Sequence, residues 1–99
     1  MKDLDSIFEL VRDEVKPIVG PLVNHAKRWE LYIRKYNNAL QNCPLDNQHL
    51  KEYKSYYNLL KEAQTQYVAV TKVLLSAVRR DCAEEADEFE EYLKQNGMG

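Results

Sequence analysis

The chain has 99 residues, of which 44% are hydrophobic and 30% charged, with only three glycines and three prolines. This composition disfavours disorder and is typical of a single helix-rich domain. The net charge of −2 argues against nucleic-acid binding over the whole surface, although residues 1–16, 17–80 and 81–99 carry −2, +6 and −6.

Membrane insertion and export are not expected from this sequence. No run approaches the roughly 18 apolar residues that a membrane-spanning helix needs. The opening MKDLDSIFEL carries acids where a secretion signal has a basic region followed by a long apolar one. Cys43 and Cys82 are far apart, and no Asn-x-Ser/Thr sequon occurs. We therefore expect a cytoplasmic or otherwise intracellular protein with no membrane partner.

Two helices are predicted in the first half of the chain, over about 4–16 and 21–42. Asp3, Asp5 and Ser6 offer N-caps for the first. Apolar or aromatic residues recur every third or fourth position, namely Leu4, Phe8, Val11, Val15, Ile18, Leu22, Trp29, Tyr32 and Tyr36. The segment KPIVGP interrupts them, because Pro17 and Pro21 each remove a backbone donor and clash with the preceding turn. We predict a kink or break at 17–21 while the apolar stripe continues.

A third helix is predicted over 46–95, after a short turn at Pro44 with Asp46 as its N-cap. The segment from Asn47 to Asn96 contains no glycine or proline. Its stripe consists of Leu50, Tyr53, Tyr57, Leu60, Tyr67, Val70, Leu74, Val78, Cys82, Ala86, Phe89 and Leu93. A break near 65–71 is the alternative, because β-branched residues there lower helix propensity. We expect one domain over 1–96 and a flexible tail at 97–99.

The two stripes predict an antiparallel pairing in an all-α fold. Folding back at Pro44 sets Tyr36 against Tyr53, Leu22 against Tyr67, and His25 against Gln64 as a polar layer that fixes the register. In the extended form, two copies of this hairpin complete a four-helix bundle as a homodimer. In the alternative, breaks at 17–21 and 65–71 give a compact monomeric four-helix bundle.

An aromatic and basic cluster is predicted near the turn. Its aromatic members are Trp29, Tyr32, Tyr36, Tyr53, Tyr56 and Tyr57, and its basic members include Arg34, Lys35 and Lys54. Packing within the hairpin explains many of these rings, but tyrosine and tryptophan are also common in binding hot spots. Bases beside aromatic rings could alternatively hold single-stranded nucleic acid.

A second candidate surface is the acidic stretch that closes the chain. Its carboxylates include Glu84, Glu85, Asp87, Glu88 and Glu91. They are interpreted either as a solvated helix face or as a docking site for a basic partner.

Catalytic motifs are not found in the sequence. It has no glycine-rich phosphate loop, nucleophile elbow or metal-binding pattern, so we expect no catalytic residue, metal or cofactor. The sequence therefore predicts a small non-enzymatic helical protein that binds another protein, as an adaptor, inhibitor or regulator. The alternative is a single-stranded nucleic-acid-binding module that uses the turn end.

Overall fold

The computed structural model describes residues 3–95 and contains only helices and their connections in that range. The elements are α1 (Leu4–Leu10), the 3-10 turn η1 (Asp13–Val15), α2 (Lys16–Asn42), α3 (Leu50–Asp81) and α4 (Ala83–Leu93). The predicted all-α class is confirmed. The predicted tail at 97–99 lies outside the described residues.

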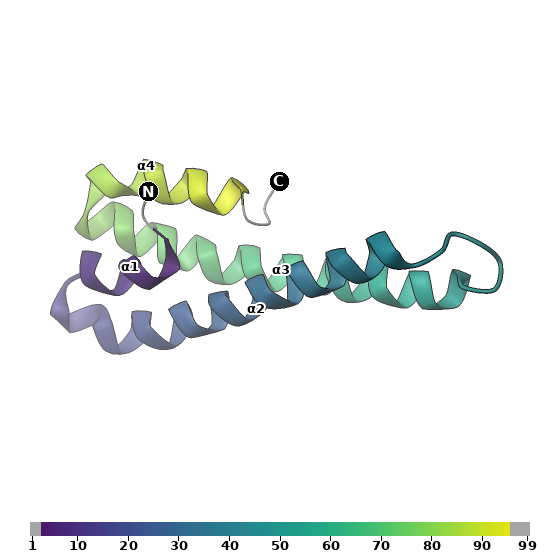
Figure 1. The fold of residues 1–99 in the computed structure, drawn as a ribbon. Coiled ribbons are helices and arrows are strands. Elements are labelled where there is room, and N and C mark those ends of the chain that lie inside the picture. The colour runs from purple at the N-terminus through teal and green to yellow at the C-terminus, as the bar shows by residue number, and fades with distance from the viewer. Residues whose placement is uncertain (1–2, 96–99) are drawn as a thin grey trace.

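α2 and α3 form a long antiparallel hairpin, and α1 and α4 pack against one end of it (Figure 1). α4 folds back along α3, so four helices lie side by side at this end. The other end consists of α2 and α3 alone. The molecule measures 53 × 22 × 16 Å. It is an elongated hairpin with a four-helix base.

The first helix ends earlier than predicted. It begins as expected, with the Asp3 carboxylate accepting a hydrogen bond from the backbone N–H of Ser6 (3.2 Å). It stops at Leu10, and Val11 and Arg12 are extended. The Lys16 ammonium then donates to the carbonyls of Phe8 (2.7 Å) and Val11 (2.8 Å), which satisfies acceptors at this helix end.

The predicted break at 17–21 is therefore wrong in position, because KPIVGP lies in the first turns of α2. Pro17 occupies the first turn, where a backbone N–H has no helical partner to lose. Pro21 lies inside the helix. The Phe8 ring packs over Gly20, since a Cβ there would lie 3.4 Å from Phe8 Cε2. A kink at this segment stays a prediction.

α3 is continuous through the predicted weak stretch at 65–71, and the chain breaks instead at Cys82. The hydroxyl of Thr65 donates to the carbonyl of Lys61 (2.9 Å), and that of Thr71 donates to the carbonyl of Tyr67 (2.6 Å). These bonds give the threonine hydroxyls acceptors within the helix, and the helix continues past both residues. The predicted single helix over 46–95 thus divides into α3 and α4, which lets the apolar face of α4 pack on the base.

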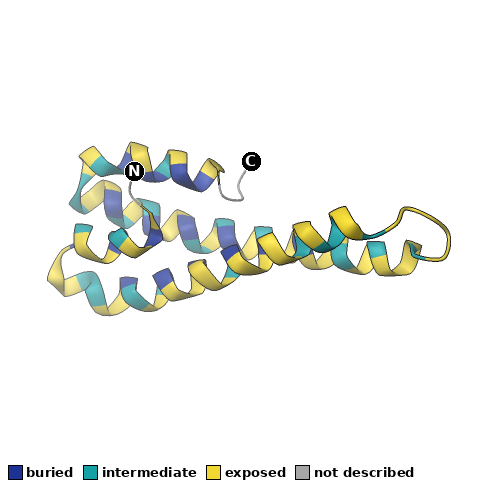
Figure 2. Cartoon of the chain, viewed as in Figure 1, coloured by how far each residue is buried: buried dark blue, intermediate teal, exposed yellow. Residues whose placement is uncertain are grey.

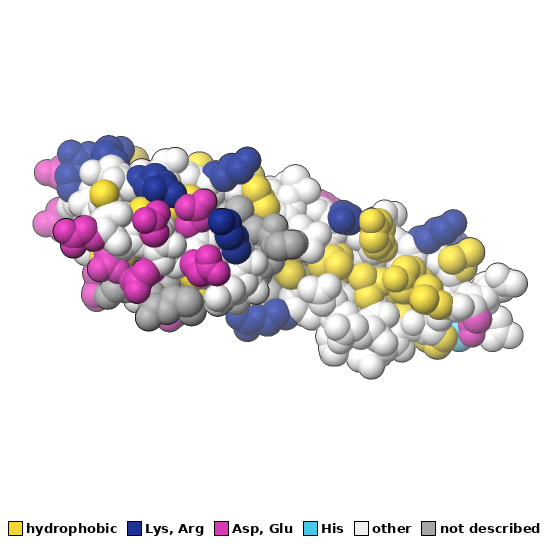
Figure 3. Space-filling view, turned by 90° about the horizontal axis from the view of Figure 1, so that it is seen from above, with side chains coloured by type: hydrophobic (Ala, Val, Ile, Leu, Met, Phe, Trp, Pro, Cys, Tyr) yellow, Lys and Arg dark blue, Asp and Glu magenta, His cyan; other side chains and the backbone are white. Residues whose placement is uncertain are grey.

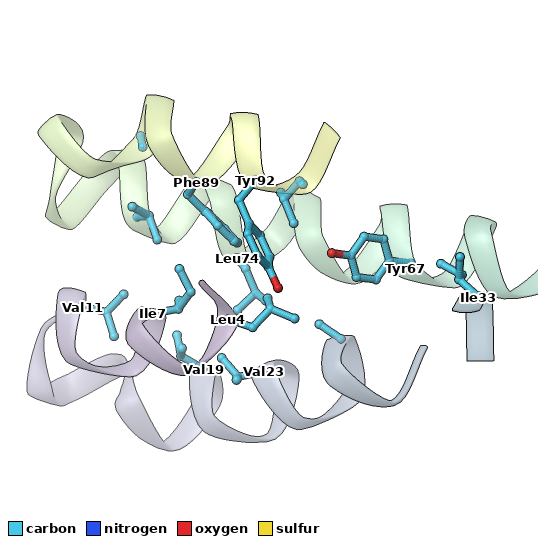
Figure 4. Close-up of a cluster of buried hydrophobic side chains, with 14 of the residues drawn as sticks. Leu4, Ile7, Val11, Val19, Val23, Ile33, Tyr67, Leu74, Phe89 and Tyr92 are labelled. Atoms are coloured by element: carbon cyan, nitrogen blue, oxygen red, sulfur yellow. The ribbon is translucent and has the colours of Figure 1, made fainter. Parts of the chain in front are cut away.

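The core occupies the four-helix base (Figures 2 and 4). The stripe predicted for the second half supplies much of it, including the fully buried Tyr67, Leu74 and Phe89. On α2 the buried row is displaced by one residue from the predicted stripe, and it consists of Val19, Val23, Ala26, Glu30 and Ile33. Two adjacent apolar rows run along α2. Packing fully buries only one of them, and Leu22, Trp29 and Tyr36 of the other are half-buried against the core.

The pairing register of α2 and α3 also differs from the prediction. The predicted register set Leu22 against Tyr67, whereas Tyr67 bonds to Glu30 and Leu22 lines a groove with Val73 and Leu74. The connection spans residues 43–49 and is longer than the predicted turn. Stripes spaced by threes and fours still meet when one helix slides along the other by a turn or more, so the stripes alone could not detect the difference.

A buried carboxylate links three helices where α4 ends on the hairpin. Glu30 is 7% exposed. It accepts hydrogen bonds from the hydroxyls of Tyr67 (3.0 Å) and Tyr92 (3.2 Å) and from the Arg34 guanidinium (2.7 Å). The predicted polar layer of His25 and Gln64 does not form, because His25 is exposed. The buried polar contact between α2 and α3 is instead the hydrogen bond of Tyr67 to Glu30.

Candidate functional site

The free end of the hairpin carries an apolar groove. We call it the tip groove, and its lining residues are Leu45, Leu50, Tyr53, Lys54, Tyr57 and Asn58. Its volume is about 390 Å³. Leu45 is 77% exposed and Tyr57 is 46% exposed. Large apolar side chains are therefore left open to solvent at this end.

Helical spacing in α3 builds the groove. Counted from Leu50, its other lining positions in this helix follow after three, four, seven and eight residues, so they share one side. The loop supplies Leu45. Asp46 orders the end of this loop by accepting from the backbone N–H of His49 (3.0 Å) and by contacting the His49 ring (2.7 Å) just before α3 begins. Figure 3, seen from above Figure 1, shows hydrophobic side chains at this end flanked by Lys and Arg.

Two lysines border the tip groove on α3. Lys54 lines it, and Lys61 follows seven residues later on the same side of the helix. The Lys61 ammonium lies 5.4 Å from the centre of the Tyr57 ring, a cation–π distance. Arg34 is engaged with Glu30, and Lys35 is exposed on α2. The groove is thus apolar with a basic edge.

The predicted aromatic cluster divides into two groups. On α2, Trp29 and Tyr32 meet edge to face at 5.5 Å, and Tyr32 stacks on Tyr36 at 6.1 Å. Within residues 3–95, the α3 tyrosines make no ring contact with this row. Tyr53 and Tyr57 line the tip groove, and Tyr56 is half-buried. The cluster therefore contributes to two separate surfaces.

A second groove of about 230 Å³ lies between α2 and α3. Its lining includes Ile18, Leu22, Val73 and Ala77, and no residue of α1 or α4. It opens on a side of the hairpin that these short helices leave uncovered. Together with the aromatic row of α2 it forms what we call the open face.

The predicted acidic residues lie along α4. Glu84, Asp87, Glu88 and Glu91 are exposed, and Glu85 is half-buried. The helix also meets α3 through Arg79, which lies 3.6 Å from Asp87 and 2.6 Å from Glu90. α4 is thus an acidic amphipathic helix with its apolar face in the core.

Within residues 3–95, no three acidic, histidine or cysteine side chains gather where they could hold a metal ion. Burial raises the pKa of the Cys43 thiol, which disfavours the reactive thiolate.

None of the helices described here has the length and apolar character required to cross a membrane.

Sequence reasoning missed the buried role of Glu30 and the contribution of Leu45 to the tip. Glu30 stands between Ala26 and Ile33 in the buried row of α2. A charged residue at a position where the helical spacing calls for an apolar one is the feature of the sequence that indicates this role. The role of Leu45 depends on the fold of the loop.

The chain matches no protein-family model, no curated protein and no solved structure.

Proposed function

We propose that the chain is a small non-enzymatic helical protein that binds another protein, as an adaptor, inhibitor or regulator, through the tip groove. The carrying observation is the groove itself, where Leu45, Leu50 and Tyr57 stay exposed although the base of the same molecule has a packed core. Exposed apolar side chains gathered in a groove and bordered by charge are typical of protein-binding surfaces.

The divided aromatic residues favour a protein over single-stranded nucleic acid. Successive bases need rings and phosphate-binding cations along one continuous track. Here the row of Trp29, Tyr32 and Tyr36 belongs to α2, and Tyr53 and Tyr57 belong to a different groove. The groove instead has the apolar centre and polar edge expected for a protein partner.

We further propose a homodimer that pairs two open faces. The molecule is 53 Å long and at least 16 Å wide, so this face can offer roughly 800 Å² per copy, the area of a standard interface. An antiparallel arrangement sets the basic hairpin end of one copy beside the acidic base of the other, and this complementarity argues for a second copy as the occupant.

The proposed location is inside the cell. Cys43 and Cys82 are both free thiols in the structure. They lie beyond opposite ends of α3, which separates them by roughly 48 Å at the usual helical rise. An intrachain disulfide would therefore require a different fold.

Affinity capture from the native host tests the proposed function, with Tyr57→Ser compared to the wild type. We expect a protein that co-purifies with the wild type and is lost with the variant. Leu31→Ser is the matched control, because Leu31 is 62% exposed and lines neither groove. Capture that is equal for all three proteins would contradict the proposal, and so would nuclease-sensitive capture.

A further inference from the structure

α3 carries a row of basic residues along one edge, and α4 pairs with this edge at Arg79. Lys54 and Lys61 lie 18 residues before Lys72 and Arg79. Eighteen residues make about five full turns of α-helix, so each later residue occupies the same edge as its earlier counterpart. The four residues form one basic edge along the helix.

The apolar positions of α3 repeat with the same period. Leu50, Tyr53 and Tyr57 lie 18 residues before Val68, Thr71 and Leu75, which share their angular positions on the helix. At the base, Thr71 is fully buried, and Leu75 packs against the core. At the tip, Leu50 is 43% exposed and Tyr57 is 46% exposed. The same side of α3 is thus covered at the base and open at the tip.

α4 shows which kind of helix covers this side. Its apolar residues Ala86, Phe89, Tyr92 and Leu93 are buried, and its carboxylates at Asp87 and Glu90 meet Arg79 of the basic edge. Its last helical turn reaches the cluster around Glu30 through Tyr92. Beyond that point the described chain supplies no further helix to the hairpin (Figure 1).

The charge at the open half is complementary to an acidic ligand. Among the residues described, neither Lys54 nor Lys61 forms an ion pair, while Arg79 on the same edge forms two. A carboxylate of a ligand could therefore pair with Lys54 or Lys61 without first breaking an ion pair within the protein. Cations beside an apolar groove favour a helix with acids along the border of its apolar face.

From these observations we infer that the tip groove binds an acidic amphipathic helix of the partner protein, in line with α4 and beyond its end. The apolar face of that helix packs on Leu50, Tyr53 and Tyr57, and its carboxylates face Lys54 and Lys61. The inference rests on the proposed function, because it names the chemistry of the partner that the tip groove takes.

The probe is a capped synthetic peptide with the sequence of residues 83–95, added to the full-length isotope-labelled protein. We expect its binding to shift backbone amide resonances in the segment 45–61. Replacing Phe89, Tyr92 and Leu93 of the peptide with serine keeps every charge and should abolish these shifts. Replacing Asp87 with asparagine and Glu90 with glutamine keeps the apolar face and should weaken binding roughly tenfold.

Variants of the protein locate the contact. Lys54→Glu combined with Lys61→Glu should weaken binding of the peptide by roughly tenfold or more. The matched control is Arg28→Glu combined with Lys35→Glu, which makes the same change in net charge at two exposed positions of α2 that are also seven residues apart. We expect this control to bind within about twofold of the wild type.

Several results would overturn the inference. They are absence of shifts, shifts confined to residues 71–93 through displacement of α4, and equal loss of affinity in the two charge variants. If the host partner is captured through Tyr57 but the peptide does not bind, the proposed function stands and the acidic helix is wrong. If capture is independent of Tyr57, the proposed function fails by itself.

Discussion

Glu30 joins α2, α3 and α4 through three side-chain partners. Replacing it with alanine withdraws the acceptor that two buried tyrosine hydroxyls share. We expect Glu30→Ala to lower the free energy of unfolding by about 2–3 kcal/mol in urea titrations. Glu30→Gln should lower it less, because its amide oxygen still accepts.

The exposed Glu62→Ala is the control for this change and should stay within about 0.5 kcal/mol of the wild type. If Glu30→Ala were as stable as Glu62→Ala, the cluster would not be what holds α4 to the hairpin.

The same cluster predicts a loss of stability in alkali. Burial, reinforced by the charge of Glu30, raises the pKa of Tyr92 to about 12, and the pKa of Tyr67 is raised by the same causes. An unfolded tyrosine has a pKa near 10. The fold therefore favours the protonated phenol, and this contribution is complete below about pH 10 and is lost as the pH rises towards 12.

We expect the free energy of unfolding to fall between about pH 10 and 12. Tyr92→Phe should reduce that slope, whereas Tyr32→Phe, which removes an exposed hydroxyl outside the cluster, should leave it unchanged. Equal slopes in all three proteins would show that the buried phenols do not contribute.

The two prolines of α2 predict opposite effects. Pro21 lies inside the helix, where it removes one hydrogen bond and strains the preceding turn. After allowance for the greater freedom of the unfolded chain, Pro21→Ala should raise the free energy of unfolding by about 1–2 kcal/mol. Pro17 lies in the first turn, so Pro17→Ala should lower it by up to about 1 kcal/mol. Thermal melts of both variants check these signs, and a loss of stability at Pro21→Ala would contradict them.

The element boundaries show how far sequence patterns reach. Helical class, the N-cap at Asp3 and most of the α3 stripe follow from periodicity and capping chemistry. The break at Cys82 does not follow from these patterns, because no glycine or proline marks it. The break is stabilised by tertiary packing, since the apolar residues of α4 are buried once the chain turns back. Choosing between Ile18 and Val19 as the buried residue likewise requires knowing which helices cover α2.

The candidate site was predicted in part for the same reason. Tyr53, Tyr57 and Lys54 were identified from composition near the turn, and the structure brings them together in one groove. Trp29, Tyr32 and Tyr36 were assigned to the same cluster, but their helix turns them into a separate row. A linear list of residues carries no information about which side of each helix is covered.

For the whole molecule, the open face predicts self-association. Ile18 is 64% exposed and lines the groove between α2 and α3. Ile18→Glu should convert a dimer into a monomer in sedimentation velocity experiments, because it places a charge in an apolar interface. Leu31→Glu changes an equally exposed leucine outside both grooves and should remain dimeric. A wild-type protein that sediments as a monomer at high concentration would rule out this pairing.

The central claim is that the tip groove is the surface that receives the partner protein. Hydrogen–deuterium exchange of the full-length protein, alone and with its captured partner, tests this claim directly. We predict slower exchange in the segment 45–61 and unchanged exchange on the acidic helix at 83–93. Protection of 83–93 with no change at 45–61 would contradict the account and would assign binding to the acidic face.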